Sequence, residues 1–164
     1  MTSDLSPPAS QATTAASMIA RQAIVNVDKE VVGYELFNRS RAAGEHTAAS
    51  DVALLFTALS HAGVEELMGS KLLFVNSTHE SLADGPLELL NPENIVLEVE
   101  PLGHVAATEA VARLPILRGL RERGFKLSFN HTVLESAYAT WLPLADFIKL
   151  DLTVLRPEQL AVLV

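Results

Sequence analysis

Short apolar runs alternate with amphipathic stretches along most of this sequence, and this alternation constrains the fold more than any other feature. Two β-branched runs, MIARQAIVNVD and EVVGYELFN, are separated by the polar turn VDKE, which predicts a hairpin of two strands. Further strand-like runs follow at KLLFVN, NIVLEVE, FKLSFN and ADFIKLDL, with helical spacing between them. The order predicts about six strands in an α/β fold, with a largely parallel sheet and helices outside it.

Helices are predicted between the later strands. Apolar residues recur at helical spacing over residues 47–68, and Gly69 follows as a stop signal. Residues 105–123 form a second long helix, in which Pro115 predicts a kink or a break into two pieces. The final run RPEQLAVLV is expected to begin another helix, because a proline is well placed in a first helical turn.

The length of the chain suits one domain. Its 164 residues are 49% hydrophobic, enough for one sizeable core. Residues 1–17 are rich in Ser, Thr, Ala and Pro and nearly uncharged, so we expect a disordered tail followed by a single domain over residues 18–164. A complete eight-unit β/α barrel typically needs about 250 residues. An open doubly wound sheet and a barrel cut short are therefore both compatible with the pattern.

Charge and composition exclude several classes of function. A formal net charge of −8 argues against nonspecific binding to DNA, which requires positive charge along the phosphates. The absence of cysteine excludes disulfides, zinc–thiolate sites and a cysteine nucleophile. No apolar run approaches the roughly 20 residues of a membrane span, and the N-terminus lacks the pattern of a signal peptide. We therefore predict a cytoplasmic protein without a membrane partner.

Polar residues lie within or at the end of five of the apolar strands. They are Glu35, Asn76, Glu98, Asn130 followed by His131, and Lys149. A single residue of this kind usually caps a strand or faces solvent, because a buried charge is costly unless it is paired or bound to metal. Repetition on five strands favours a shared polar site at the C-terminal edge of the sheet. Carboxylates and an amide oxygen would suit Mg²⁺ or Mn²⁺ there.

The first of these strands resembles the opening of EAL domains, the phosphodiesterases and receptors for cyclic di-GMP. In that family a strand ends in Glu-Ala-Leu and an arginine follows shortly. Here Glu35, Leu36 and Phe37 stand in those places, and Arg39 matches the arginine. The resemblance implies that Glu35 binds metal and takes part in catalysis, and that Arg39 binds a phosphate of the ligand through its guanidinium.

Three later motifs extend the resemblance from about residue 19 to the C-terminus. The run FVN matches the family's asparagine-bearing strand at Asn76. LEVEP is similar to the Glu-Leu-Thr-Glu motif, with Glu98 on its metal-binding glutamate, and ADFIKLD places Lys149 on the catalytic lysine. The ARQ opening, GYEL and KLDLTVLRPEQL are most similar to the EAL branch that is joined to an HDOD domain.

The family resemblance implies a fold and a reaction. The fold would be a (β/α)₈ TIM-like barrel, present here as an incomplete EAL fold of about six strands. The reaction would be two-metal hydrolysis, in which Mg²⁺ or Mn²⁺ activates a water that opens cyclic di-GMP to pGpG.

One strand end departs from the family's chemistry. Active relatives present two consecutive aspartates where this chain has Asn130 and His131. Asparagine is a neutral and weaker ligand for Mg²⁺, and histidine prefers softer ions. The later barrel strands, which supply another glutamate, a loop and a glutamine, also have no counterpart in this sequence. The retained residues, including Glu35, Asn76 and Glu98, are therefore expected to be vestigial.

These observations predict a catalytically degenerate EAL-like signalling module that acts by protein interaction and is not an enzyme. A cut barrel leaves an unpaired strand edge that tends to recruit a partner or a second copy. Two alternatives stay open: a cyclic di-GMP receptor without catalysis, and a metal-dependent phosphodiesterase. No cofactor is expected unless activity remains, in which case Mg²⁺ or Mn²⁺ is needed. The other histidines, His46, His61, His79 and His104, show no ligand spacing and are predicted to be surface or cap residues.

Overall fold

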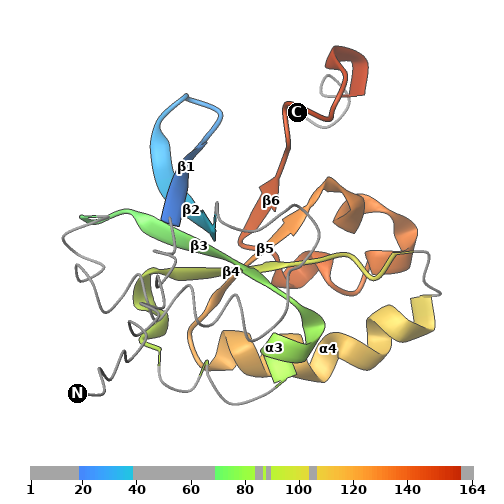
Figure 1. The fold of residues 1–164 in the computed structure, drawn as a ribbon. Coiled ribbons are helices and arrows are strands. Elements are labelled where there is room, and N and C mark those ends of the chain that lie inside the picture. Colours follow the sequence, from blue (N-terminus) through green and yellow to red (C-terminus); the bar gives the residue numbers. More distant parts are fainter. Residues whose placement is uncertain (1–18, 39–68, 84–86, 88–89, 104–106, 160–164) are drawn as a thin grey trace, which may run out of the picture.

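A computed structural model describes residues 19–38, 69–83, 87, 90–103 and 107–159 of the chain. Six strands form one curved sheet in the order β1-β2-β3-β4-β5-β6, with helices on its convex side (Figure 1). The bounds are β1 Ile19–Val25, β2 Val31–Asn38, β3 Leu72–Ser77, α3 His79–Ala83, β4 Ile95–Val99, α4 Ala107–Glu122, β5 Lys126–Asn130 and β6 Phe147–Lys149. The predicted six-stranded, incomplete barrel-like α/β fold is confirmed.

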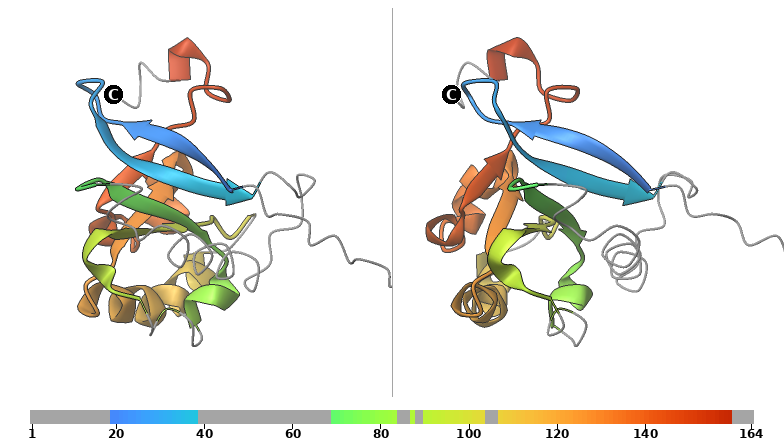
Figure 2. Two further views of the ribbon diagram at one scale, coloured as in Figure 1. Left: turned by 60° about the vertical axis from the view of Figure 1, so that its left-hand side comes forward. Right: turned by 90° about the vertical axis from the view of Figure 1, so that its left-hand side faces the viewer.

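The N-terminal strands form the predicted antiparallel hairpin. The side-chain oxygen of Asn26 closes its turn by accepting hydrogen bonds from the backbone N–H groups of Asp28 and Glu30. Lys29 adopts a positive φ of 65°, a conformation that the tight turn requires of it. Figure 2 shows this hairpin above the sheet and the helices below it. From β2 to β6 every neighbouring pair of strands is parallel.

The main hydrophobic core lies between the convex face of the sheet and α4. Leu97 and Leu127 are completely buried in it, and Leu117 of α4 is 1% exposed. Trp141 is also 1% exposed, and its indole N–H donates a 2.7 Å hydrogen bond to the carbonyl oxygen of Ala110 in the first turn of α4. Because side chains alternate along a strand, the residues between these core positions face the concave side.

Helix α4 continues through Pro115 without a break, so the predicted division into two pieces is wrong. Pro115 lies on the exposed side of the helix, and Val111, one turn earlier, is 48% exposed. Proline has no backbone N–H, so the carbonyl oxygen of Val111, four residues before Pro115, has no donor within the helix. This carbonyl faces water, which can donate the hydrogen bond instead.

Three short 3₁₀ turns connect β5 to β6 in place of a long helix. They are η3 His131–Leu134, η4 Ser136–Tyr138 and η5 Leu142–Leu144. A further 3₁₀ turn, η2 Pro92–Asn94, precedes β4. The predicted tail over residues 1–17 and the predicted helix over residues 47–68 lie outside the described residues. Of the predicted final helix, residues 157–159 are described, and they form one helical turn. Among the described residues, every helix is too short or too polar to cross a membrane.

Candidate functional site

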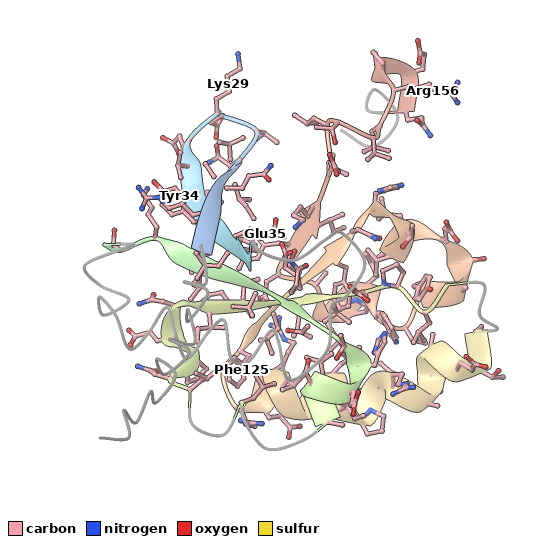
Figure 3. The ribbon with its side chains drawn as sticks, viewed as in Figure 1. Lys29, Tyr34, Glu35, Phe125 and Arg156 are labelled. Carbon is pink, nitrogen blue, oxygen red and sulfur yellow. The ribbon has the colours of Figure 1, made fainter. Side chains whose placement is uncertain are left out.

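Four of the predicted site residues meet on the concave side of the sheet. Glu35 lies on β2, Asn76 on β3, Glu98 on β4 and Lys149 on β6. Asn76 and Glu98 are direct neighbours in the parallel register of β3 and β4. Figure 3 labels Glu35, which lies in the space between the hairpin and β6. The prediction that these strands bring their polar residues together is thus confirmed for this set.

Hydrogen bonds connect all four side chains. Lys149 Nζ donates to Glu35 Oε2 at 2.9 Å and to Glu98 Oε2 at 2.6 Å. Asn76 Nδ2 donates to the other oxygen of Glu35 at 2.6 Å. One ammonium group therefore bridges two carboxylates, those of Glu35 and Glu98, which lie 63 positions apart in the sequence. Only one formal negative charge remains when all three groups are ionised.

The burial of Glu98 controls the electrostatics of this cluster. Its side chain is 8% exposed, and its Oε1 has no hydrogen-bond partner in the described part of the chain. Burial, together with the nearby charge of Glu35, raises the pKa of Glu98 to about 7 in spite of the ammonium of Lys149. Burial lowers the pKa of Lys149, but the two carboxylates outweigh burial and leave that pKa above its ordinary value. Lys149 is therefore charged at neutral pH.

Ser128 on β5 belongs to the same face. It is the register neighbour of Glu98, is 1% exposed, and its hydroxyl oxygen also has no partner among the described residues. Ser128 was not among the predicted site residues. Its signal was a small polar residue in the apolar run KLSFN, two positions before Asn130 and hence on the same face of the strand.

Asn130 is the register neighbour of Lys149, but its amide oxygen is used within its own turn. Asn130 Oδ1 accepts hydrogen bonds from the backbone N–H of Thr132 at 3.0 Å and from the Thr132 hydroxyl at 2.5 Å. This caps the turn η3, of which His131 is the first residue. His131 is half-buried.

Arg39, the predicted phosphate-binding residue, lies outside the described residues, as do His46, His61 and His104. His79 begins α3, and its Nε2 lies 2.9 Å from the carbonyl oxygen of Glu100. Burial lowers the pKa of His79, which keeps its ring neutral at pH 7. This local contact agrees with the predicted structural role for His79.

The donor set of the cluster does not fit two divalent ions. Glu35, Glu98 and Asn76 supply oxygen atoms of the kind that Mg²⁺ and Mn²⁺ prefer, and the unpartnered Oε1 of Glu98 is one open position. The ammonium of Lys149, however, lies between the two carboxylates where a cation would bind. Across the described ranges there is no group of three or more acidic, histidine or cysteine side chains that could hold a metal ion.

Comparison with known proteins assigns the fold. No family model and no curated protein matches this sequence. Solved structures do match, among them BlrP1 of Klebsiella pneumoniae as a manganese/cy-diGMP complex at pH 9.0, with a TM-score of 0.59 and 23% identity over 87% of this chain. The EAL enzyme Bd1971 matches in its cAMP-bound form, with a TM-score of 0.51, and in its cGMP-bound form, with 0.53. Identity to Bd1971 is 16% over 89% and 88% of this chain.

The chain has an EAL-like fold. It spans 42% of the BlrP1 chain and 50% and 49% of the two Bd1971 chains, so it corresponds to half or less of each of these proteins. The EAL-like fold confirms the architecture that the sequence motifs implied. It leaves the chemical role of each site residue, and the branch of the family, as predictions.

Proposed function

We propose that this chain is a signalling module of the cyclic di-GMP type, built on an EAL-like fold, that does not hydrolyse the nucleotide. The observation that carries the proposal is the strand end at Asn130, where active relatives present an aspartate and this chain has a neutral amide whose oxygen accepts hydrogen bonds from Thr132. Hydrolysis by two metals needs carboxylates that are free to hold them. Here Asn130 and His131 stand in place of two of these carboxylates.

In this proposal the module works in the bacterial cytoplasm through contact with a protein, either a partner or a second copy. Support comes from β6, which is the last strand of the sheet within the described residues. Ile148 on this strand is 38% exposed, and Leu152 and Val154 just beyond it are 66% and 69% exposed. An edge strand with apolar neighbours favours pairing with another chain. The similarity to the EAL branch joined to HDOD domains remains part of the proposal.

A cyclic di-GMP receptor without turnover is the second candidate. It is favoured by the cyclic nucleotides bound in the similar structures, cy-diGMP in BlrP1 and cAMP or cGMP in Bd1971. In this candidate Arg39 binds a phosphate through its guanidinium. The metal-dependent phosphodiesterase is the third, and it needs Mg²⁺ or Mn²⁺ to displace the ammonium of Lys149 from Glu35 and Glu98.

One pair of measurements separates the three functions. The chain is incubated with cyclic di-GMP and excess Mn²⁺ or Mg²⁺, and pGpG is measured by chromatography, while calorimetry in the same buffers measures binding. If no pGpG forms and no heat of binding is measured, the result supports action by protein contact. Binding without pGpG that is lost in Arg39→Ala, but kept in the control Arg41→Ala, supports the receptor. Production of pGpG that disappears in Glu35→Ala would overturn the proposal.

A further inference from the structure

The register of strand β6 decides whether Lys149 reaches the cluster with Glu35 and Glu98. Strand β6 has only three residues, and among the described residues it pairs with β5 alone. Side chains alternate between the two faces of a sheet, so a slip of one residue would turn Lys149 to the convex face. Ile148 would then replace the ammonium on the concave face. A strand this short needs a separate device that fixes its register.

Asp146, the residue before β6, provides such a device. Its backbone N–H donates to the carbonyl oxygen of Leu127 on β5 at 2.9 Å. In return, the backbone N–H of Leu127 donates to Asp146 Oδ2 at 2.8 Å. The carboxylate thus acts as the missing backbone acceptor at the start of the strand pair. A shifted register would break both bonds at once.

Arg121 near the end of α4 fixes the carboxylate in place. Its Nη1 forms an ion pair with Asp146 Oδ2 and also donates to the carbonyl oxygen of Leu144 at 3.0 Å. The side chains of Arg121 and Asp146 are 35% and 26% exposed, so this contact is partly shielded from solvent. The contact places Asp146 on the convex face, where α4 lies. Lys149, three residues further, must therefore point to the concave face.

We propose that Asp146 is a positioning residue of the candidate site, which together with Arg121 sets the register of β6 and holds Lys149 between Glu35 and Glu98. The importance of that site rests on the proposed function, but the positioning itself does not depend on any nucleotide. The experiment can therefore fail or succeed independently of the tests for hydrolysis and binding.

The test measures how fast each lysine of the whole 164-residue chain is acetylated by trace acetic anhydride, by quantitative mass spectrometry. Lys29 and Lys71 are exposed and serve as internal references. In Asp146→Ala we expect the rate at Lys149 relative to Lys71 to rise about fivefold or more, since about 1 kcal/mol of lost local stability has that effect. Glu135→Ala, which removes an exposed acid from the same connection, should leave the ratio unchanged.

A second set of variants separates positioning from general loss of stability. Leu82→Ala in α3 removes a core side chain that is 5% exposed and should lower the melting temperature without raising the Lys149 ratio. Asp146→Asn keeps an acceptor for Leu127 but loses the ion pair, so its ratio should lie between those of the wild type and Asp146→Ala. The Lys149 ratio of Arg121→Gln should equal that of Asp146→Asn. The double variant should show the same ratio as either single variant, because both remove the same ion pair.

An unchanged Lys149 ratio in folded Asp146→Ala would overturn the proposal. An equal rise in Leu82→Ala would overturn it too, because Lys149 would then respond to stability alone. If Asp146→Ala does not fold, Asp146→Asn and Arg121→Gln carry the test. In that case, unchanged ratios in both variants contradict the proposal.

Discussion

Lys149 Nζ lies 2.6 Å from Glu98 Oε2, across strands β4 and β6, which are not neighbours in the sheet. The curvature of the sheet allows the same ammonium to reach Glu35 Oε2 on β2 at 2.9 Å, because in a flat sheet β2 and β6 would lie four strand spacings, or roughly 19 Å, apart. The contact pairs a buried carboxylate with a positive charge and adds the carboxylate of Glu35 from the far side. This cluster is the basis of the first two predictions.

Replacing Lys149 with methionine should destabilise the fold. The substitution keeps most of the side-chain volume but leaves Glu98 and Glu35 without their shared cation, and we expect a loss of about 2 kcal/mol in the free energy of unfolding at pH 8. Urea denaturation checks this value. The control Lys71→Met changes an exposed lysine and should alter stability by less than about 0.5 kcal/mol. Equal effects of the two variants would show that the Lys149 contacts add no stability.

The raised pKa of Glu98 predicts that the free energy of unfolding falls as pH rises, because the proton bound by folded Glu98 is lost. With a pKa of about 7 in the folded chain and 4.5 as the ordinary value, the folded state binds more protons between pH 4.5 and 7. The stabilisation by this protonation is complete below pH 4.5 and lost above pH 7. Relative to Glu98→Gln, the wild type should lose up to about 3 kcal/mol over this window.

The check for Glu98 is a series of urea denaturations of both proteins at several pH values. Glu80→Gln, at an exposed position of α3, is the matched control and should follow the wild type at every pH. Parallel curves for the wild type and Glu98→Gln would show that Glu98 titrates normally in the folded chain.

A third prediction concerns Gly33 on β2, two residues before Glu35. A Cβ at Gly33 would lie 2.5 Å from the backbone oxygen of Leu72 and 2.7 Å from the ring of Phe74. Gly33→Ala should therefore force β2 away from β3 and cost about 1–3 kcal/mol. Gly119→Ala in α4 meets nothing within 4 Å and should instead stabilise the chain by about 0.5–1 kcal/mol. Thermal and urea unfolding measure the change in stability of both variants. An unchanged stability of Gly33→Ala would contradict the close approach of β2 and β3.

The fourth prediction tests the anchor of the β5–β6 connection. Trp141→Phe keeps an aromatic ring against Tyr138 and Phe129 but loses the N–H that bonds to the buried carbonyl of Ala110. We expect a loss of about 2 kcal/mol, measured by circular dichroism because the single tryptophan is removed. Leu142→Ala, at a neighbouring position that is 40% exposed, is the control and should cost much less. Similar losses would exclude the hydrogen bond as the cause.

Much of the fold was predictable from local patterns. Polar residues interrupted or ended five apolar strands, and those of four strands, Glu35, Asn76, Glu98 and Lys149, are in contact through hydrogen bonds. The hairpin and the parallel strands also follow from periodicity and turn residues. These features depend on neighbours in sequence, which a single sequence displays directly.

Features that depend on distant neighbours were missed or wrongly predicted. The pattern at Asn130 suggested a lost metal ligand but not that its oxygen would cap its own turn. A kink or a break was expected at Pro115, and the break is wrong; sequence alone does not show that this part of α4 faces solvent. Neither Ser128 nor Asp146 was recognised. Their roles appear only when β5 is placed beside β4 and β6.

The most direct test of the central claim is a single-turnover assay with cyclic di-GMP and the protein in large excess over nucleotide, at saturating Mn²⁺. The replacement of two anionic ligands by Asn130 and His131 predicts no pGpG above the level of a protein-free control, for the wild type and for Glu35→Ala alike. Formation of pGpG by the wild type, lost in Glu35→Ala, would contradict the claim that this EAL-like module lacks catalysis.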